Sequence, residues 1–395
     1  MMLSHKIRLV PTDRQIDYFR RACGTTRFTY NWALAEWKQQ YEAGEKPSGH
    51  RLKKRFNEIR AQEYPWTYEV HRDCTAGAFS AVQSAFKHFF RRVKEKQRPG
   101  YPKFKKKGRC KDSFPIANDK FALDGKRIRI PKLGWVNMRE SLRFEGKIMS
   151  AVVSRTADYW FVAIAVGTKV DSTSPKTKET VGVDLGITAL ATLSNGKKYQ
   201  HSKRWKRLER QVRRLQKRVS KKEKGSANRA KAVTRLARKH YKLACLRADT
   251  LHKITTELVE AYPTIVVEDL NVKGMLKNHN LACAISRQGW GEFFRQLGYK
   301  TQMRDRQLIV AGRFYPSSKT CSDCGAIAPK LPLSIREWVC SACGVIHDRD
   351  INAAINLSNL PVGYGKVKPV ETEALVRSRC VSDETAVCEA GTEPG

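Results

Sequence analysis

The first half of the chain begins and ends with segments in which polar and apolar residues alternate. Residues 4–10 have this period of two, which is typical of a half-buried strand, and the same period returns over residues 112–170. Within the second segment, Asp124 and Gly125 have the sequence of a tight hairpin turn. We therefore predict that these strands form a small β-barrel.

The stretch between these strands has the period of amphipathic helices. Helices are expected from Thr12 or Asp13 to about Cys23, from about Arg27 to Ala43 after a break at Gly24, over 50–62 and over 74–96. The predicted organisation is a helical unit inserted into the barrel. Its boundaries are residues 1–12 and 97–170 for the barrel and 13–96 for the helices.

A polar, proline-containing linker at residues 171–178 precedes a second alternation of strands and helices. The expected elements are a strand ending at Asp184, strands at about 188–193 and after a turn at Asn195-Gly196, helices over 203–261 broken at Gly225, a strand ending at Glu268-Asp269, a helix around 287–304, a strand at about 307–313 and a helix starting near Asp350. Ribonuclease-H-like sheets follow this order. The prediction for the whole chain is a multidomain α+β protein, with an RNase H-like α/β domain over 179–312 and 345–360.

The charge of the chain limits the kinds of molecule that it is expected to bind. Lys and Arg number 76 against 38 Asp and Glu, which gives a net charge of +38 spread over most of the length. A chain this basic fits a protein that neutralises many phosphates, and it is hard to reconcile with a small-molecule enzyme. The sequence contains no apolar run of about 18 residues, so no membrane partner is expected.

Four cysteines have the spacing of a metal site. Cys321 and Cys324 form one Cys-x-x-Cys pair, and Cys340 and Cys343 form a second after an interval of fifteen residues. Zinc held by four thiolates has no open position, so we predict one structural Zn²⁺ in a zinc ribbon at 313–344, inserted in the RNase H-like domain. The seven remaining cysteines are scattered, which indicates reduced thiols and a cytoplasmic, nucleoid-associated setting.

Three acidic residues lie at the ends of predicted strands or at the start of a predicted helix in the α/β domain. Asp184 ends the first strand, Glu268 ends a later central strand, and Asp350 lies at the start of the last helix. Carboxylates that converge in one place repel unless cations lie between them, so we predict a site for two Mg²⁺ ions that hydrolyses phosphodiesters. In this arrangement Asp184 is expected to bridge the two ions.

Each of these acids also has a plainer interpretation. An aspartate after an apolar strand is often a turn residue, and Asp350 could simply cap its helix. Asp269 could take the place of Glu268, and Asp348 that of Asp350, although the phase of the apolar run favours Glu268.

Taken together, the motifs resemble those of a known family. The segments G-V-D-L-G-I, V-V-E-D-L-N, C-S-D-C-G, C-S-A-C-G and D-R-D-I-N-A-A-I-N-L resemble the split RuvC nuclease and zinc-ribbon motifs of the transposon-encoded TnpB family. That family is ancestral to the compact type V CRISPR effectors. The N-terminal segments K-I-R-L-V-P, C-G-T-T-R-F-T-Y-N-W-A-L and G-Y-P-K-F-K-K-K extend the resemblance over nearly all of residues 5–360.

The resemblance implies an RNA-guided DNA endonuclease. It assigns the nuclease positions to Asp184, Glu268 and Asp350 and the zinc positions to the four paired cysteines. The implied partners are a guide RNA from the transposon end, with one protein per RNA, and a double-stranded DNA target with a short adjacent motif. In such complexes base pairing selects the sequence, and the protein supplies a basic channel.

Two basic stretches are candidates for nucleic-acid contacts. Residues 91–111 carry eleven Lys and Arg against one acid, and residues 201–242 carry eighteen against two. Aromatic rings between cations favour nucleic acid over a merely solvated surface. The candidate side chains are Lys103, Phe104, Lys105, Lys106, Lys107, Arg204, Arg207, Arg210 and Arg214, and also Arg27, Tyr30 and Asn31, which could instead belong to the core of the helical unit.

Two other functions are compatible with the sequence, namely a guided DNA-binding repressor without cleavage and a DNA-joining transposase. The beginning of the chain lacks the apolar stretch of a signal peptide. Residues 361–395 are rich in Gly and Pro and mildly acidic, so they are expected to be disordered.

Overall fold

The computed structural model describes residues 2–168, 174–332, 334–360 and 365–367. The described chain forms two compact units that meet near residue 170 in the sequence. Both units mix helices and strands, as the α+β prediction requires. No helix in these described ranges is both long and apolar enough to cross a membrane.

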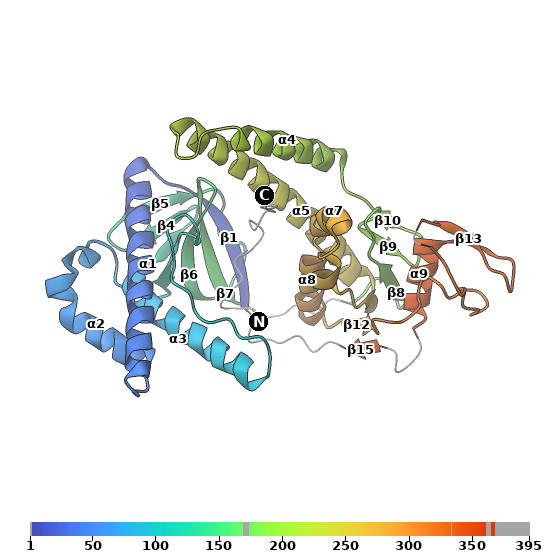
Figure 1. The fold of residues 1–395 in the computed structure, drawn as a ribbon, viewed down its shortest axis with the longest axis horizontal. Helices are drawn as coiled ribbons and strands as arrows, with labels where there is room; N and C mark the ends of the chain where they lie inside the picture. The colour runs from blue at the N-terminus through green and yellow to red at the C-terminus, as the bar shows by residue number, and fades with distance from the viewer. Residues whose placement is uncertain (1, 169–173, 333, 361–364, 368–395) are drawn as a thin grey trace, which may run out of the picture. The chain divides into compact units, whose positions relative to one another are not determined.

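The first unit contains an antiparallel sheet with the strand order β2-β6-β7-β1-β5-β4-β3 (Figure 1). Its strands are β1 (Met2–Val10), β2 (Ser113–Ala117), β3 (Ala122–Asp124), β4 (Arg127–Ile130), β5 (Gly134–Met138), β6 (Lys147–Thr156) and β7 (Tyr159–Gly167). The hairpin predicted at Asp124-Gly125 joins β3 to β4. Among the described strands no pairing joins β2 to β3, so the sheet does not close into a hydrogen-bonded ring.

Three helices accompany this sheet, namely α1 (Asp13–Glu42), α2 (Gly49–Glu63) and α3 (Asp73–Lys94), with a short 3₁₀ turn at Pro65–Glu69. Thr12 caps α1 in a reciprocal capping box with Gln15. The predicted break at Gly24 is wrong, because α1 runs through it without interruption. Burial of Ala22, Cys23 and Thr25 outweighs the modest cost of one interior glycine.

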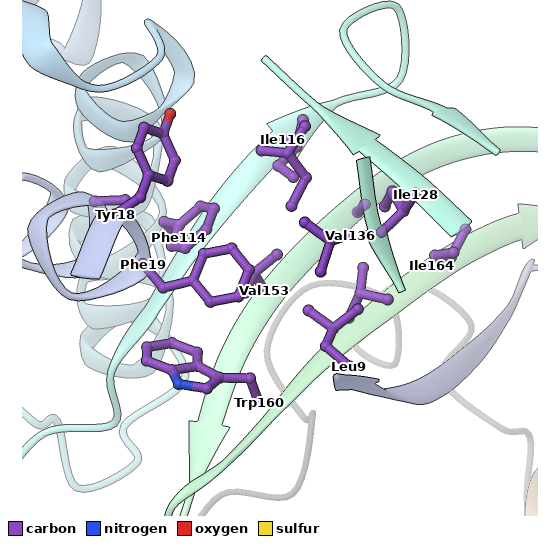
Figure 2. Close-up of a cluster of buried hydrophobic side chains, with 14 of the residues drawn as sticks. Leu9, Tyr18, Phe19, Phe114, Ile116, Ile128, Val136, Val153, Trp160 and Ile164 are labelled. Carbon is purple, nitrogen blue, oxygen red and sulfur yellow. The ribbon is translucent and has the colours of Figure 1, made fainter. Parts of the chain in front are cut away.

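Aromatic side chains join α1 to the sheet. Figure 2 shows Phe19 pointing from the helix into the cluster of strand residues, and its ring centroid lies 5.0 Å from Trp160 and 5.7 Å from Phe114. Ile7 and Leu9 of β1 enter the same core, because alternate residues of the strand face the helices. A second core joins the three helices, where Trp37 stacks on Phe86 at 4.3 Å.

The second unit is built on a sheet of order β10-β9-β8-β11-β12-β15. Its strands are β8 (Thr180–Asp184), β9 (Ala191–Leu193), β10 (Lys198–Tyr199), β11 (Thr264–Glu268), β12 (Gln307–Ala311) and β15 (Gly365–Val367). The central strands β8, β11 and β12 are parallel, whereas β9, β10 and β15 pair antiparallel with their neighbours. The predicted disorder of 361–395 is wrong for 365–367, because β15 pairs with the free edge of β12; the rest of that stretch lies outside the described residues.

Helices lie on both faces of this sheet. They are α4 (Lys203–Ser220), α5 (Ala227–Ala261), α6 (Val272–Met275), α7 (His279–Gln288), α8 (Trp290–Met303) and α9 (Arg349–Ser358). Val183 and Val267 point to the core with α5 and α8, while Val266 packs with Leu357 of α9. The helix predicted around 287–304 is confirmed as α8. The helix α7 before it was not predicted, and Gly289, at φ +69, separates the two.

The continuity of α1 can be tested with one substitution. We expect Gly24→Ala to stabilise the chain by about 0.4–1 kcal/mol, because an added Cβ at this helical position meets no atom within 4 Å. The matched control is Gly225→Ala, which should destabilise, because Gly225 also has open space but adopts φ +92. Thermal unfolding of the full chain measures both. A lower Tm for Gly24→Ala would mean that the helix is broken there.

Candidate active site

The register of the central sheet brings two of the predicted acids together. Val183 of β8 pairs with Val267 of β11 in a parallel ladder, so the next residues, Asp184 and Glu268, lie side by side where the strands end. Both side chains are half-buried. The carboxyl ends of parallel strands are the usual place for a site in sheets of this kind.

Helix α9 supplies the third acid. It packs on β8 at Gly182, where an added Cβ would lie 1.9 Å from the Ala354 carbonyl oxygen and 2.5 Å from the Ser358 nitrogen. Only glycine permits backbone to approach backbone this closely. Asp350 lies about one turn before Ala354, so this contact carries its carboxylate towards Asp184.

Electrostatics show that the three carboxylates share one environment. Burial raises the pKa of Asp184 well above its ordinary value, and the charges of Glu268 and Asp350 raise it further. Burial also raises the pKa of Glu268, although a hydrogen bond donated by the Ser317 hydroxyl acts in the opposite direction. A cation between these groups would remove this repulsion.

The neighbouring acids that could have replaced them have other partners. Asp348 caps α9, because its Oδ1 accepts from the amides of Asp350 and Ile351 at 3.0 Å each, and its other oxygen accepts from Lys198 at 2.7 Å. Asp269 is paired with Arg313 at 2.8 Å. Asp350 is therefore not the capping residue.

Two arginines act on the acids. The charges of Arg349 and Arg336 both oppose the rise in the pKa of Asp184, and Arg336 Nη1 lies 3.3 Å from Asp350 Oδ1. Among the described residues, the sulfurs of the four paired cysteines all lie within 4.8 Å of one another, whereas the oxygens of the three carboxylates do not all lie within this distance of one another. The donor set is one of oxygens alone, which fits Mg²⁺ and other hard divalent cations.

The four predicted zinc ligands form a cluster. Their sulfurs all lie within 4.8 Å of one another, with Cys321 and Cys343 3.7 Å apart and Cys324 and Cys340 3.6 Å apart. Each pair sits in the same kind of turn, closed by Gly325 at φ +77 and Gly344 at φ +75. The strands β13 (Glu337–Val339) and β14 (Ile346–Asp348) lead into and out of the second turn.

The surroundings act on these thiols in opposite directions. Backbone amides of Cys343 and Ala342 lower the pKa of Cys340 to about 6, which favours the thiolate that zinc requires, whereas burial and the neighbouring thiols raise the pKa of Cys343 to about 12. His347, which the sequence did not single out, places Nε2 3.0 Å from the Cys321 sulfur. A partner of this kind orients a ligand from outside the cluster.

Two asparagines of α9 connect the cysteine cluster to the acids. The Asn352 and Asn356 side chains donate to the Thr320 carbonyl at 2.7 and 2.6 Å, and Asn356 also donates to the Ser317 carbonyl at 2.7 Å. Asn352 accepts from the Ser322 amide at 2.9 Å. The buried amides therefore fix the segment that holds Glu268 at one end and enters the first cysteine turn at the other. The sequence analysis did not predict this role for the two asparagines. Their spacing of four residues, which places both side chains on one side of a helix, was the available signal.

Three family models match the chain, namely "Probable transposase" over residues 163–279, "Cas12f1-like, TNB domain" over 290–357 and "Helix-turn-helix domain" over 1–46. Within the last range the structure has β1 and the continuous α1 instead of two helices joined by a turn. A "Putative RNA-guided DNA endonuclease" of Streptomyces pristinaespiralis is 36% identical over 358 residues, which are 89% of this chain and 87% of the relative. The chain belongs to the transposon-encoded TnpB family.

Other similarities agree with this membership. "Putative RNA-guided DNA endonuclease InsQ" of Escherichia coli (strain K12) is 31% identical over 89% of this TnpB-family chain and 90% of the relative. A solved structure described as the "Cas12f1-sgRNA-target DNA complex" matches with a TM-score of 0.53 and 16% identity, over 89% of this chain and 84% of that one. At this identity the likeness concerns the fold alone, a multidomain α+β architecture.

The predicted nucleic-acid contacts of this TnpB-family chain differ in accessibility. Arg204, Arg207, Arg210 and Arg214 are exposed along α4, at spacings that place them on one side of the helix. Lys103, Phe104, Lys106 and Lys107 are exposed in the loop before β2.

The three candidates on α1 are engaged inside the protein. Tyr30 is buried in the helical core with Lys105 Nζ 3.8 Å from its ring centre, and Asn31 exchanges two hydrogen bonds with the Lys105 backbone at 2.9 and 2.8 Å. Arg27 pairs with Asp112 at 3.0 Å. These side chains hold the basic loop against α1. Tyr30 is therefore a core residue of the helical unit, which was the alternative to a nucleic-acid contact.

The contact between α9 and β8 leads to a prediction. Gly182→Ala should destabilise the chain by about 1–3 kcal/mol, because the methyl group collides with the helix backbone and the helix must move away from the strand. Thermal unfolding and amide hydrogen exchange of α9 measure this. Gly291→Ala in α8, where no atom lies within 4 Å, is the matched control. Equal exchange of α9 in both variants would contradict the close packing.

The cysteine cluster leads to a second prediction. Purified protein should contain about one zinc per chain, and Cys324→Ser should lower this content sharply, because the tetrahedral site loses one ligand. Amide exchange should also rise across 315–322, the segment that the α9 asparagines hold. Cys245→Ser, at an exposed cysteine outside the cluster, is the control. An unchanged zinc content would exclude Cys324 as a ligand.

Proposed function

We propose that this protein is an RNA-guided DNA endonuclease that cleaves phosphodiesters with two divalent metal ions. The observation that carries the proposal is the placement of Asp184 and Glu268 side by side where β8 and β11 end, with the charge of Asp350 from α9 acting on Asp184, in a member of the TnpB family. The net charge of +38 supports substrates with many phosphates.

The domain organisation is part of this proposal. A RuvC-like, RNase H-like nuclease domain spans 179–312 and 345–360, with the zinc ribbon 313–344 inserted before its last helix. A wedge domain of barrel type spans 1–12 and 97–170, with the helical unit 13–96 inserted and the linker 171–178 following. The parallel core β8, β11 and β12, extended by antiparallel β9 and β10, supports the RNase H-like assignment.

Magnesium is the proposed cofactor of the nuclease site, and its ligands would be Asp184, Glu268 and Asp350. When bound, two such ions would activate a water molecule and would neutralise the charge that develops on the departing 3′ oxygen. The Ser317 hydroxyl donates a hydrogen bond to the Glu268 carboxylate and so fixes its position. Arg336 lies beside Asp350 and adds a positive charge where a phosphate would be bound.

Zinc has a structural role in this proposal. Four thiolate ligands leave no position for substrate, so Cys321, Cys324, Cys340 and Cys343 would hold the ribbon together without taking part in chemistry. Through Asn352 and Asn356 the ribbon remains tied to the helix that carries Asp350.

The proposed partners are one guide RNA per protein, transcribed from the transposon end, and double-stranded DNA with a short motif beside the target. The exposed arginines of α4 and the cations of the loop 103–107 support backbone contacts to RNA or to the heteroduplex. Phosphate contacts of this kind carry no sequence information, so base pairing with the guide would select the target.

The proposal predicts a separation of cleavage from binding. Asp184→Ala should abolish cutting of a guide-matched plasmid in Mg²⁺, while guide-dependent DNA binding is retained, because only the metal site is lost. The measurement is the amount of linear plasmid, with binding followed by gel shift. The control is Asp249→Ala, an exposed acid on α5 paired with Lys253, which should leave cutting within a few-fold of the wild type.

Each other product has a distinct meaning. Bound but intact plasmid with the wild-type ribonucleoprotein would indicate a guided repressor, and strand-joined product would indicate a transposase. Full cutting by Asp184→Ala would show that the metal site lies elsewhere.

A further inference from the structure

One aromatic side chain near the acids is exposed to an unusual degree. Phe314 is 93% exposed, which is the largest value among the large apolar side chains that the structure describes; the next, Ile346, is 72% exposed. A phenylalanine in this position contributes little to folding, because burial of its ring is what would stabilise the protein.

The backbone that carries Phe314 is nevertheless held on both sides. Phe314 lies in a turn closed by the Tyr315 amide donating to the Gly312 carbonyl at 2.9 Å. On one side Arg313 donates to Asp269 at 2.8 Å, and on the other the Tyr315 hydroxyl donates to the Asn356 carbonyl at 3.2 Å. An ordered turn that presents an uncovered ring is suited to binding a flat apolar partner.

The turn lies at the same end of the sheet as the acids. It follows β12 directly, and the last residue of β12, Ala311, pairs with Glu268 in the parallel ladder. Three residues after Phe314, the Ser317 hydroxyl donates to that same Glu268. The turn therefore runs past the end of the strand that supplies one of the three carboxylates.

We propose that Phe314 stacks on a nucleobase of the DNA strand held at the carboxylate site, and so positions the strand for cleavage. This inference rests on the proposed function and adds a residue to it. Charge favours a nucleic-acid strand over an apolar protein partner, because the chain carries a net charge of +38 and residues 313–319 contain no acid. Every base has a flat face for such a ring, so the contact suits an enzyme whose sequence choice belongs to its guide.

The experiment uses the ribonucleoprotein of the full chain and guide-matched DNA. Phe314→Ala should lower the single-turnover cleavage rate or the affinity for DNA by roughly 5- to 150-fold, the range that loss of one stacked base gives. Phe314→Trp should retain activity, because it keeps a flat ring. Phe314→Leu should be impaired, whereas an apolar contact with a protein would tolerate leucine. Ile346→Ala, at another exposed apolar residue, should behave like the wild type.

A second measurement identifies the base and does not depend on cleavage. The fluorescent base 2-aminopurine is placed at successive positions of each DNA strand and read in complexes formed without divalent metal. At one position its fluorescence should be lower with wild-type protein than with Phe314→Ala, because stacking quenches it. An abasic site at that position should slow the wild type but not slow Phe314→Ala any further.

The outcomes separate the two proposals. If the wild type does not cut but the fluorescence difference is present, the nuclease proposal fails and the stacking contact stands. If the wild type cuts, and Phe314→Ala matches it in rate, affinity and fluorescence at every position, the stacking contact is excluded. A lower Tm for Phe314→Ala, without any position-specific change, would assign the ring a folding contact and would also overturn the proposal.

Discussion

The contact between α9 and β8 is the constraint on which the site depends. Gly182 lies two residues before Asp184, and the space of its missing side chain is taken by the backbone of α9. Because both partners are backbone, no change of rotamer could relieve a collision there. The same contact places the start of α9, and with it Asp350, beside the carboxyl ends of the strands. A small residue in the strand thus determines whether three acids that are far apart in sequence can act together.

Bringing these acids together has an electrostatic cost, and the structure offsets part of it with local donors. Ser317 donates to Glu268, and Arg336 lies beside Asp350. Both donors belong to the stretch that enters or forms the proposed zinc ribbon, and the amides of Asn352 and Asn356 fix the start of that stretch to α9. The cysteine cluster and the carboxylates are consequently supported by the same helix, so a change in the structure of one should alter the position of the other.

The basic residues divide into those that build the protein and those that face solvent. Lys105 packs over Tyr30, and burial lowers its pKa, which is the cost of removing a cation from water. Its neighbours Lys106 and Lys107 remain exposed, as do the arginines on one side of α4. Anchoring one lysine of the loop fixes the backbone of its neighbours, so part of the charge excess serves to hold the remainder in place at the surface.

Sequence by itself determined the features that depend on local pattern. The cysteine spacing identified the four cysteines whose sulfurs cluster, apolar periodicity located β8, β11 and α9, and the phase of the β11 run favoured Glu268 over Asp269. Local pattern failed where tertiary packing outweighed it: α1 continues through Gly24 because its neighbours are buried, and 365–367 pairs with β12 because that edge has unpaired backbone groups. Only the tertiary structure decided that Asp348 caps α9 and leaves Asp350 facing Asp184, and that Tyr30 is core. Those roles depend on distances between residues that the sequence places far apart, and no local periodicity encodes such distances.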